Sequence, residues 1–270
     1  MKTEDASSFW DKKAAFFASK ERQNRNRRVG ELYEETCWRY IKPVLPSIEN
    51  SIILEAGCGT GRWVFRLAPM GYRIELLDLS EEMIKYAREM VEQKGLSDFV
   101  TGYHALDICK MNKLIADKFD LILALGNPVS LCSNPEKAIE ELSRITKPGG
   151  YVVCDVMNRY RTALDLARKN DFSQFFEVLY NGRMISESGL THYHFRPEEL
   201  EGLFRKKGFN SFQTAALCPF FEMPASKEHM DLLDDDKTFK AIQKAFSAFA
   251  KNPNVIGLSS RLLIVARKER

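Results

Sequence analysis

The feature that most constrains this chain is a glycine-rich turn directly after a short apolar run. Residues 53–63 read Ile-Leu-Glu-Ala-Gly-Cys-Gly-Thr-Gly-Arg-Trp, so three glycines stand at alternate positions. The apolar run predicts a buried strand, and the residues beyond the glycines predict a helix. Glycine has no Cβ, so the backbone can approach a ligand closely and adopt positive φ. The segment therefore predicts a strand–loop–helix unit that holds a ligand through its backbone.

The spacing of these glycines excludes two common nucleotide loops. A dinucleotide fingerprint has the pattern GxGxxG, but Arg62 occupies the third glycine position and Gly61 comes one residue early. No Gly-Lys-Ser or Gly-Lys-Thr follows, so a Walker loop is excluded as well. NAD, FAD and nucleoside triphosphates are therefore disfavoured as ligands.

Beyond residue 51 the chain alternates short apolar runs with helical patterns, which indicates a parallel sheet with crossover helices. Helix boundaries support this pattern: Ser80 and Asn134 are predicted N-caps, and Lys147 to Gly150 predict a turn. Three further stretches, residues 1–46, 158–190 and 219–258, are predicted to be mainly helical. The predicted strands are 52–56, 73–78, 99–107, 121–125, 151–156, 212–217 and 260–266.

Two acids follow the predicted second and third strands, Asp78 and Asp107. Together with the turn they resemble the class I S-adenosylmethionine-dependent methyltransferases, whose first motif is hydrophobic-hydrophobic-acid-x-Gly-x-Gly-x-Gly. Glu55, Gly57, Gly59 and Gly61 match that motif. The resemblance covers residues 51–156, returns at 192–209 and in the last strand, and is to the small-molecule, type 11/25-like members.

The resemblance implies a single α/β domain over residues 1–270, with a Rossmann-like, seven-stranded, mostly parallel sheet, an antiparallel last strand and helices on both faces. Residues 1–46 would form an N-terminal helical cap, 51–156 the cofactor-binding core, and 158–190 and 219–258 helical lid inserts. It implies S-adenosylmethionine as donor and S-adenosylhomocysteine as product. Asp78 would accept the ribose hydroxyls and Asp107 would contact the adenine amino group; the neighbouring candidates for cofactor contact are Leu79, Ile108 and Leu125.

The N-terminal stretch holds candidates for closing the site. By the resemblance, Trp10 and Tyr33 would cover the methionine part of the cofactor, and Arg28 would pair with its carboxylate. Packing of the aromatic rings against the core, with arginines in solvent, is the alternative. The basic run Lys20 to Arg28 is predicted to be an exposed helix face.

Acceptor residues are predicted after the fourth strand and near residue 192. Asn127-Pro128 begins like the Asn-Pro-Pro-aromatic motif of amino methyltransferases, but Val129 and Ser130 replace its last two residues, and Leu-Gly-Asn resembles small-molecule N-methyltransferases of the glycine type. Strand alternation places His192, His194 and Arg196 on one face, as candidate bases and an anion-binding group, whereas Tyr193 is a further candidate for substrate binding. Surface or packing histidines are the alternative; no third ligand accompanies them, so no metal site is expected.

Composition and sequence pattern limit the compartment of the protein and the choice of methyl acceptor. The 270-residue chain has a net charge of +3, too mild by itself to indicate a nucleic-acid surface. No run approaches the roughly 18 apolar residues of a membrane span, and six scattered cysteines without CxxC favour a reduced, cytoplasmic protein. The three inserts would enclose a pocket at the strand ends, which suits a small-molecule acceptor (N, O or C). An apolar or aromatic acceptor is favoured by apolar residues of these inserts, namely Tyr180, Met184, Phe220, Phe221 and Met223. No membrane partner is expected, nucleic acid is disfavoured and the oligomeric state is open. The alternatives are an RNA or protein methyltransferase and a non-catalytic sensor that binds the cofactor.

Overall fold

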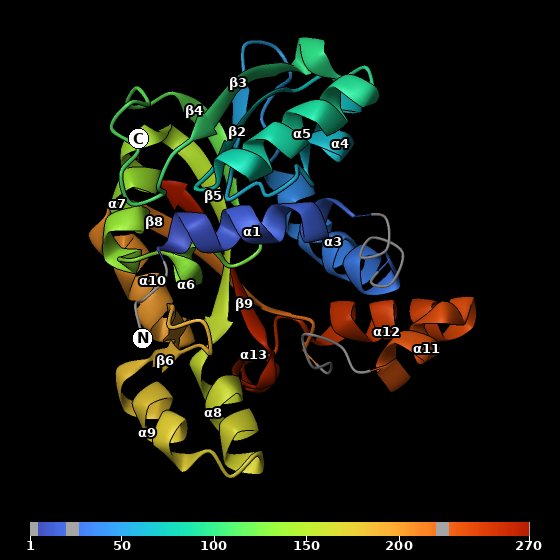
Figure 1. Cartoon of the computed structure of the whole chain (residues 1–270), viewed down its shortest axis with the longest axis vertical. Helices are drawn as coiled ribbons and strands as arrows, with labels where there is room; N and C mark the ends of the chain where they lie inside the picture. Colours follow the sequence, from blue (N-terminus) through green and yellow to red (C-terminus); the bar gives the residue numbers. More distant parts are fainter. Residues whose placement is uncertain (1–4, 20–26, 220–226, 270) are drawn as a thin grey trace.

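A computed structural model describes residues 5–19, 27–219 and 227–269 of the chain (Figure 1). Its strands are β1 (Ile52–Ala56), β2 (Arg73–Asp78), β3 (Val100–Ala105), β4 (Phe119–Ala124), β5 (Thr146–Asn158), β6 (Arg183–Ile185), β7 (Thr191–Phe195), β8 (Phe209–Leu217) and β9 (Arg261–Lys268). Its main helices are α1 (Ala6–Ala18), α3 (Arg27–Ile41), α4 (Val64–Leu67), α5 (Glu81–Gln93), α6 (Pro128–Leu131), α7 (Pro135–Ile145), α8 (Arg159–Arg168), α9 (Phe172–Asn181), α10 (Pro197–Lys206), α11 (Lys227–Asp234), α12 (Asp236–Phe249) and α13 (Pro253–Leu258).

The strands form one sheet with the order β3-β2-β1-β4-β5, in which all pairs are parallel. On the other edge of β5 lies β9, which runs antiparallel and pairs in turn with β8. These seven strands are the seven predicted from the sequence, and the antiparallel last strand is confirmed.

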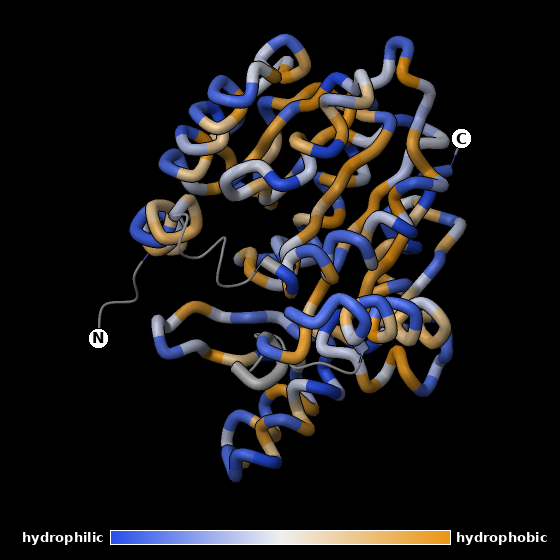
Figure 2. Tube along the Cα trace, turned by 90° about the vertical axis from the view of Figure 1, so that its right-hand side faces the viewer, coloured by the Kyte–Doolittle hydropathy of each residue, from blue (hydrophilic) through white to orange (hydrophobic). Residues whose placement is uncertain are grey.

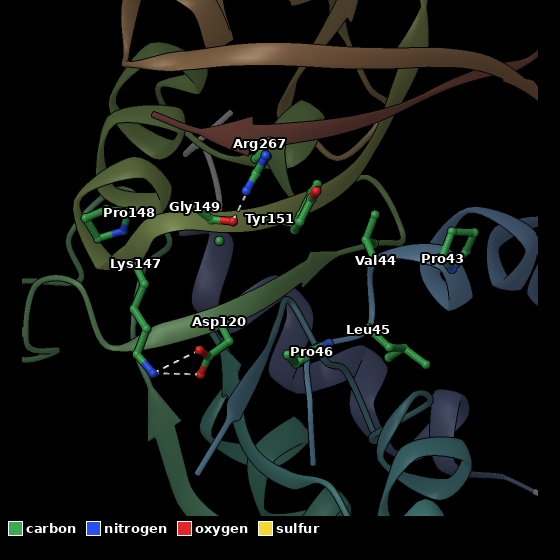
Figure 3. A pocket seen from close by; sticks show the side chains of 11 residues that line it. Pro43, Val44, Leu45, Pro46, Asp120, Lys147, Pro148, Gly149, Tyr151 and Arg267 are labelled. Atoms are coloured by element: carbon green, nitrogen blue, oxygen red, sulfur yellow. Dashed lines mark hydrogen bonds and ion pairs between the residues drawn. The ribbon is translucent and has the colours of Figure 1, made fainter. Parts of the chain in front are cut away.

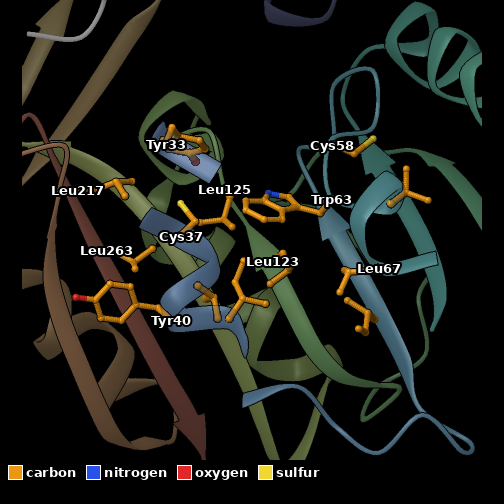
Figure 4. Close-up of a cluster of buried hydrophobic side chains, with 14 of the residues drawn as sticks. Tyr33, Cys37, Tyr40, Cys58, Trp63, Leu67, Leu123, Leu125, Leu217 and Leu263 are labelled. Carbon is orange, nitrogen blue, oxygen red and sulfur yellow. The ribbon is translucent and has the colours of Figure 1, made fainter. Parts of the chain in front are cut away.

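Helices cover both faces of the sheet, and alternate strand residues feed two separate cores. One core joins α3, α4, α5 and α12 to residues such as Ile53, Leu123 and Leu263. Figure 4 shows part of this core, including Leu123 and Leu263. The other joins α7, α10 and α13 to the intervening residues, such as Leu54 and Ile122. Figure 2 shows the apolar strands in the interior of the molecule and polar residues along the outer helices. Burial on both faces explains why these strands are continuous apolar runs.

The predicted helix starts are confirmed. The Ser80 hydroxyl accepts a hydrogen bond from the backbone N–H of Met83 at 3.1 Å, and Asn134 caps α7 through the N–H of Lys137 at 3.1 Å. The α10 helix has no capping side chain at Arg196; instead Glu199 accepts from the N–H of Arg196. These local bonds need no distant partner, so the sequence was sufficient to predict them.

One local prediction was wrong. Residues 147–150, predicted as a turn, belong to the long strand β5, because the register between β4 and β5 shifts after Phe119 and Gly149 at φ 80° absorbs the extra residues. The prediction that residues 158–190 are mainly helical is confirmed by α8 and α9, although the same segment also contains the short strand β6, which pairs with β7 as a hairpin. Most of the basic run Lys20 to Arg28, and Phe220, Phe221 and Met223 of the third insert, lie outside the described residues.

The β6–β7 hairpin extends the sheet beyond its parallel core. Met157 and Asn158, at the end of β5, pair in parallel with His194 and Phe195. One edge of β5 is occupied by β9 as far as Met157, so the hairpin pairs along the edge that β4 occupies. On that edge the pairing with β4 ends at Cys154, and the hairpin therefore lies beyond the end of β4. Among the described helices, none has the length and apolar character needed to cross a membrane.

Candidate active site

The carboxyl ends of β1 to β5 meet at one edge of the sheet, and most of the predicted site residues lie there. The strand order reverses between β1 and β4, so their following segments leave to opposite sides of the sheet. In open α/β sheets such a switch point creates the crevice in which ligands bind. The glycine turn follows β1, and Gly126 and Asn127 follow β4, on the two sides of this point.

Glu55 fixes the glycine turn from below. Its carboxylate is buried and accepts the backbone N–H groups of Arg62 and Trp63 at 3.0 and 3.1 Å, and that of Val64 at 3.2 Å. Burial raises the pKa of Glu55 to about 7, and the three N–H donors oppose that rise. The acid of the motif is therefore a structural anchor that holds the turn and the start of α4.

The three glycines of the turn all have positive φ, 73°, 55° and 80°. A Cβ on Gly57 would lie 2.6 Å from Cβ of Pro128, so this glycine permits close packing between the two loops of the crevice. A Cβ on Gly59 would meet no atom within 4 Å. The space above Gly59 is thus left open by the protein, as a ligand that contacts the backbone requires.

Asp78 is fixed beside Gly59. One carboxylate oxygen accepts the N–H of Gly59 at 2.8 Å and the other accepts the N–H of Ser80 at 3.0 Å. A carboxylate offers about four acceptor positions, so two remain for a pair of hydroxyl groups. Burial raises the pKa of Asp78, and the backbone donors oppose that rise. This geometry fits the predicted contact with a ribose.

The neighbouring candidates line the same edge. Asp107 follows β3, and one of its oxygens accepts the N–H of Cys109 at 2.8 Å. Ile108 and Leu125 are buried in the two opposite cores, and the carbonyl of Leu79 accepts the hydroxyl of Ser7 from α1 at 3.4 Å. Asp107 and Ile108 therefore follow β3, next to β2 in the sheet order, whereas Leu125 follows β4, on the other side of β2 and β1.

The N-terminal residues are placed in three different environments. Trp10 lies on α1 and makes edge contacts with Phe9 and Phe17, while α1 itself is held against the β2–α5 turn because Asp11 accepts from the hydroxyl of Ser80. Arg28 is paired with Glu31 and Asp236, so α12 takes up its charge. The predicted pairing of Arg28 with a cofactor carboxylate is therefore not prepared in this arrangement.

Tyr33 is buried on α3, and its hydroxyl donates to Asp155 at 3.2 Å. The guanidinium groups of Arg62 and Arg261 lie 5.2 and 5.3 Å from the centre of its ring. Burial and the charge of Asp155 raise the pKa of Tyr33 well above its usual value, so the hydroxyl remains a proton donor. Figure 4 shows Tyr33 near Leu125, between α3 and the sheet.

The acceptor candidates divide between two faces of the β6–β7 hairpin. His194 is buried, and neither ring nitrogen has a hydrogen-bond partner among the described residues; the same holds for Oδ1 of Asn127. His192 points to the same face as His194 because strand side chains alternate. Tyr193 packs against the core that contains Leu54 and Ile122, and its hydroxyl donates to the carbonyl of Ser133. Arg196 pairs with Glu198 and Glu199. Arg196 is therefore committed to α10.

The pKa values of both histidines are lowered, mainly by burial. For His194 the value falls to about 3, with His192 and Arg159 adding repulsion of a positive charge. His194 is thus neutral at pH 7 and a weak base, suited to hydrogen bonding. No cluster of three potential ligands forms a metal site within residues 5–19, 27–219 and 227–269.

Asp155 is the functional candidate that sequence reasoning missed. It lies within the apolar strand β5 and is fully buried, yet it accepts hydrogen bonds from Gly126, Asn127, Tyr33 and Arg261. The available signal was a lone acid inside an otherwise apolar run, because a buried charge requires partners.

A surface pocket lies at the opposite, amino-terminal edge of the sheet (Figure 3). Its volume is about 300 Å³, and the segment Pro43 to Pro46, Lys147 and Arg267 are part of its lining. The Lys147 ammonium pairs with both oxygens of Asp120, and Arg267 donates to the carbonyl of Gly149. Its charged groups are already paired with protein, and it is remote from the glycine turn.

The fold and the glycine crevice define a class I methyltransferase fold. Residues 53–150 match the family described as the methyltransferase domain. Over these residues, about a third of its length, the chain is similar to methyltransferase domains.

Curated relatives match a little under half of the chain. A malonyl-[acyl-carrier protein] O-methyltransferase of Pectobacterium atrosepticum is 34% identical over 46% of this chain and 46% of its own length. A tRNA 5-carboxymethoxyuridine methyltransferase of Escherichia coli is 29% identical over 46% of this chain and 47% of its own. The chain thus spans about half the length of the curated relatives it matches.

Solved structures share the fold over nearly the whole chain. A Thermotoga maritima methyltransferase, described as a possible histamine N-methyltransferase, has a TM-score of 0.56 at 21% identity and covers 96% of this chain and 99% of its own. A Haemonchus contortus phosphoethanolamine N-methyltransferase, solved with S-adenosyl-L-methionine, has a TM-score of 0.57 at 18% identity, over 87% of this chain and 52% of its own. At these identities the likeness extends to the fold alone.

Proposed function

We propose that this chain is an enzyme that transfers the methyl group of S-adenosylmethionine to a small-molecule acceptor by in-line displacement. The observation that carries the proposal is the geometry of the glycine turn. Glu55 holds the turn in place, and the space over Gly59, which is hydrogen-bonded to Asp78, is left open. The donor supplies an activated methyl group on a sulfonium. Asp78 would bind its ribose and Asp107 its adenine, with S-adenosylhomocysteine as the product.

Catalysis in this proposal comes from alignment. Displacement at a sulfonium carbon needs no covalent intermediate on the protein, and orienting two bound reactants supplies much of the rate. The Gly126–Asn127 turn and the glycine turn form the two sides of the crevice, so the acceptor would approach over β4 and β5. The helices α1 and α3, the N-terminal cap, would exclude water from that space.

A small acceptor is favoured by the unpartnered buried atoms. An unsatisfied buried polar group costs about 1–3 kcal/mol. Oδ1 of Asn127 and the two ring nitrogens of His194 are such groups among the described residues, at the same edge of the sheet. A compact acceptor with one or two polar groups would satisfy them, and the 158–190 and 219–258 inserts would enclose it.

A tRNA acceptor is the second candidate, because the Escherichia coli relative named above acts on tRNA and the net charge of this chain is +3. The test for both is transfer of labelled methyl from S-adenosylmethionine into a cell extract, separated into small-metabolite, RNA and protein fractions. We expect label in the small-metabolite fraction and its loss with Asp78→Ala. Label in RNA would replace the first candidate by the second, and tight donor binding without transfer would favour a sensor.

A further inference from the structure

Asp155 is a fully buried acid that the glycine-turn chemistry does not use. It lies on β5 between Cys154 and Val156, which are themselves buried in the apolar core. An ionised carboxylate in such surroundings is stable only when it is paired and hydrogen-bonded. Each of its two oxygens has two partners, and these come from three separate parts of the chain.

Oxygen Oδ1 holds the turn after β4. It accepts the N–H of Gly126 at 2.7 Å and the N–H of Asn127 at 2.8 Å. Both residues have positive φ, 101° and 67°, a conformation that glycine and asparagine adopt more readily than other residues. The next residue, Pro128, is the one that packs against Gly57 of the glycine turn. The carboxylate thus fixes one wall of the crevice.

Oxygen Oδ2 joins that wall to the helical cap. It accepts the hydroxyl of Tyr33 on α3 and one guanidinium N–H of Arg261 on β9, each at 3.2 Å. That guanidinium lies 5.3 Å from the centre of the Tyr33 ring, and the guanidinium of Arg62, which follows the glycine turn, lies 5.2 Å from it. A single carboxylate therefore connects α3, the turn after β4 and the last strand.

We propose that Asp155 is a positioning residue for the cofactor site, and that Tyr33 acts through it. Tyr33 transmits the position of α3 to the Gly126–Asn127 turn, so the affinity for the cofactor depends on the Tyr33–Asp155 bond. Tyr33 itself then needs no contact with the cofactor. The effect on cofactor affinity rests on the proposed function, whereas the coupling between α3 and the turn does not.

The affinity test is a calorimetric titration with S-adenosylhomocysteine, below the unfolding transition, of Tyr33→Phe, Asp155→Asn and the double variant. A hydrogen bond to a charged group is worth about 1.5–3 kcal/mol, so we expect Asp155→Asn to weaken binding roughly tenfold to hundredfold. We expect Tyr33→Phe to weaken it about fivefold. The double variant should bind like Asp155→Asn alone; additive losses would overturn the proposal, because Tyr33 would then act independently.

Matched controls separate positioning from loss of stability. Asp120 is also a strand carboxylate that accepts a backbone N–H, from Ile52, and pairs with a cation, but it lies at the opposite edge of the sheet. Tyr40 lies on α3 in the same core as Tyr33. Asp120→Asn and Tyr40→Phe should leave the affinity unchanged. Equal losses in test and control variants would overturn the proposal.

Amide hydrogen exchange gives a readout that needs no ligand. Asp155→Asn and Tyr33→Phe should speed exchange at Gly126 and Asn127, whereas Tyr40→Phe should not. If Asp155→Asn fails to fold, Tyr33→Phe still decides, because unchanged exchange in that variant overturns the coupling. If the wild-type chain binds no S-adenosylhomocysteine, the proposed function fails, while exchange in Tyr33→Phe still supports or overturns the link between α3 and the turn.

Discussion

The two sides of the crevice are both organised by buried or half-buried carboxylates, but their partners differ in distance along the chain. On the β1–β2 side, Glu55 accepts from residues 7 to 9 positions later, and Asp78 from residues 2 and 19 positions away. On the β5 side, Asp155 accepts from residues 28 to 122 positions away. The first side is a local motif, whereas the second exists only after the sheet has assembled.

This difference has a physical consequence for each side. A local turn needs little chain ordering beyond itself, so its residue pattern is tightly constrained and recognisable. A hub with distant partners depends on the placement of α3 and β9, and no fixed spacing records it. Variants on the β1–β2 side should therefore act on ligand contact directly, and variants on the β5 side should act through the position of other segments.

The largest expected effect is at Gly59, on the local side. Gly59→Val should abolish binding of S-adenosylhomocysteine, because its side chain would enter the space that the protein leaves open. Gly95 is the matched control, since it also has positive φ and no atom within 4 Å of an added Cβ. Both variants carry a backbone penalty of about 1–2 kcal/mol, visible as a lower Tm.

Calorimetry on the two glycine variants decides the point. If Gly59→Val binds as tightly as Gly95→Val, the ligand does not lie over the glycine turn, and the comparison between the two sides loses its first half.

Asp78→Ala should have the next largest effect. Loss of two hydrogen bonds from ribose hydroxyls to a carboxylate, at about 1.5 kcal/mol each, predicts an affinity roughly 150-fold lower. Asp171 provides the control, because it also accepts a backbone N–H at a helix start, from Gln174, but on α9. A titration in which Asp78→Ala and Asp171→Ala bind equally would remove Asp78 from the site.

The fold was predictable from sequence where local rules suffice. All seven core strands, the caps at Ser80 and Asn134 and the antiparallel last strand were correct. Strand alternation at His192 and His194 anticipated β7, but β6 was missed, because Arg183–Ile185 is only three residues long and pairs solely through β7. Residues 147–150 were misread because glycine and proline signal a turn, although here they begin a strand with a register shift.

The placement of the candidate residues was predictable to the same extent, whereas their roles stay predictions. Glu55, Asp78, Asp107 and the glycines meet at one edge because strand ends of a parallel sheet coincide. The pairing of Arg28 with a cofactor carboxylate stays a prediction; in this structure Arg28 pairs with Asp236, 208 residues away in sequence. No pattern in the sequence reveals a partner at that separation, and the same reason hid Asp155.

Glu55→Gln is expected to change the pH dependence of stability. The pKa of Glu55 is about 7 in the folded chain, above the ordinary value of 4.5. The folded state therefore binds the Glu55 proton more tightly than the unfolded state does. The contribution of this difference to the free energy of unfolding is fully present below pH 4.5 and is lost as the pH rises through 7. The loss is up to about 3 kcal/mol. The free energy of unfolding in urea should be measured for the wild type and for Glu55→Gln between pH 4.5 and 7.5. We expect the two plots of this free energy against pH to converge; parallel plots would mean that Glu55 titrates normally.

The smallest expected effect is at His194, on the assembled side. Because burial lowers its pKa to about 3, His194 holds no proton at pH 7 and gains one only with difficulty. General-base catalysis contributes roughly 10²–10⁴-fold when the pKa lies near the working pH. His194 lies far from that range, whereas His192 is only half-buried and its pKa is lowered by burial alone. Of the two predicted bases, His192 is therefore the better placed.

His194→Gln keeps a hydrogen-bonding side chain and removes the titration. The kinetics can be measured once label transfer has identified the acceptor. We expect kcat to change by less than about threefold and KM to rise, because the side chain would contact the acceptor equally in the ground state and in the transition state. His192→Gln, on the same strand face, serves as the comparison. The opposite result would be a hundredfold fall in kcat for His194→Gln, with loss of the acidic limb of the pH–rate profile. It would show that His194 is the base, so that the β5 side of the crevice takes part directly in the chemistry and does more than position other segments.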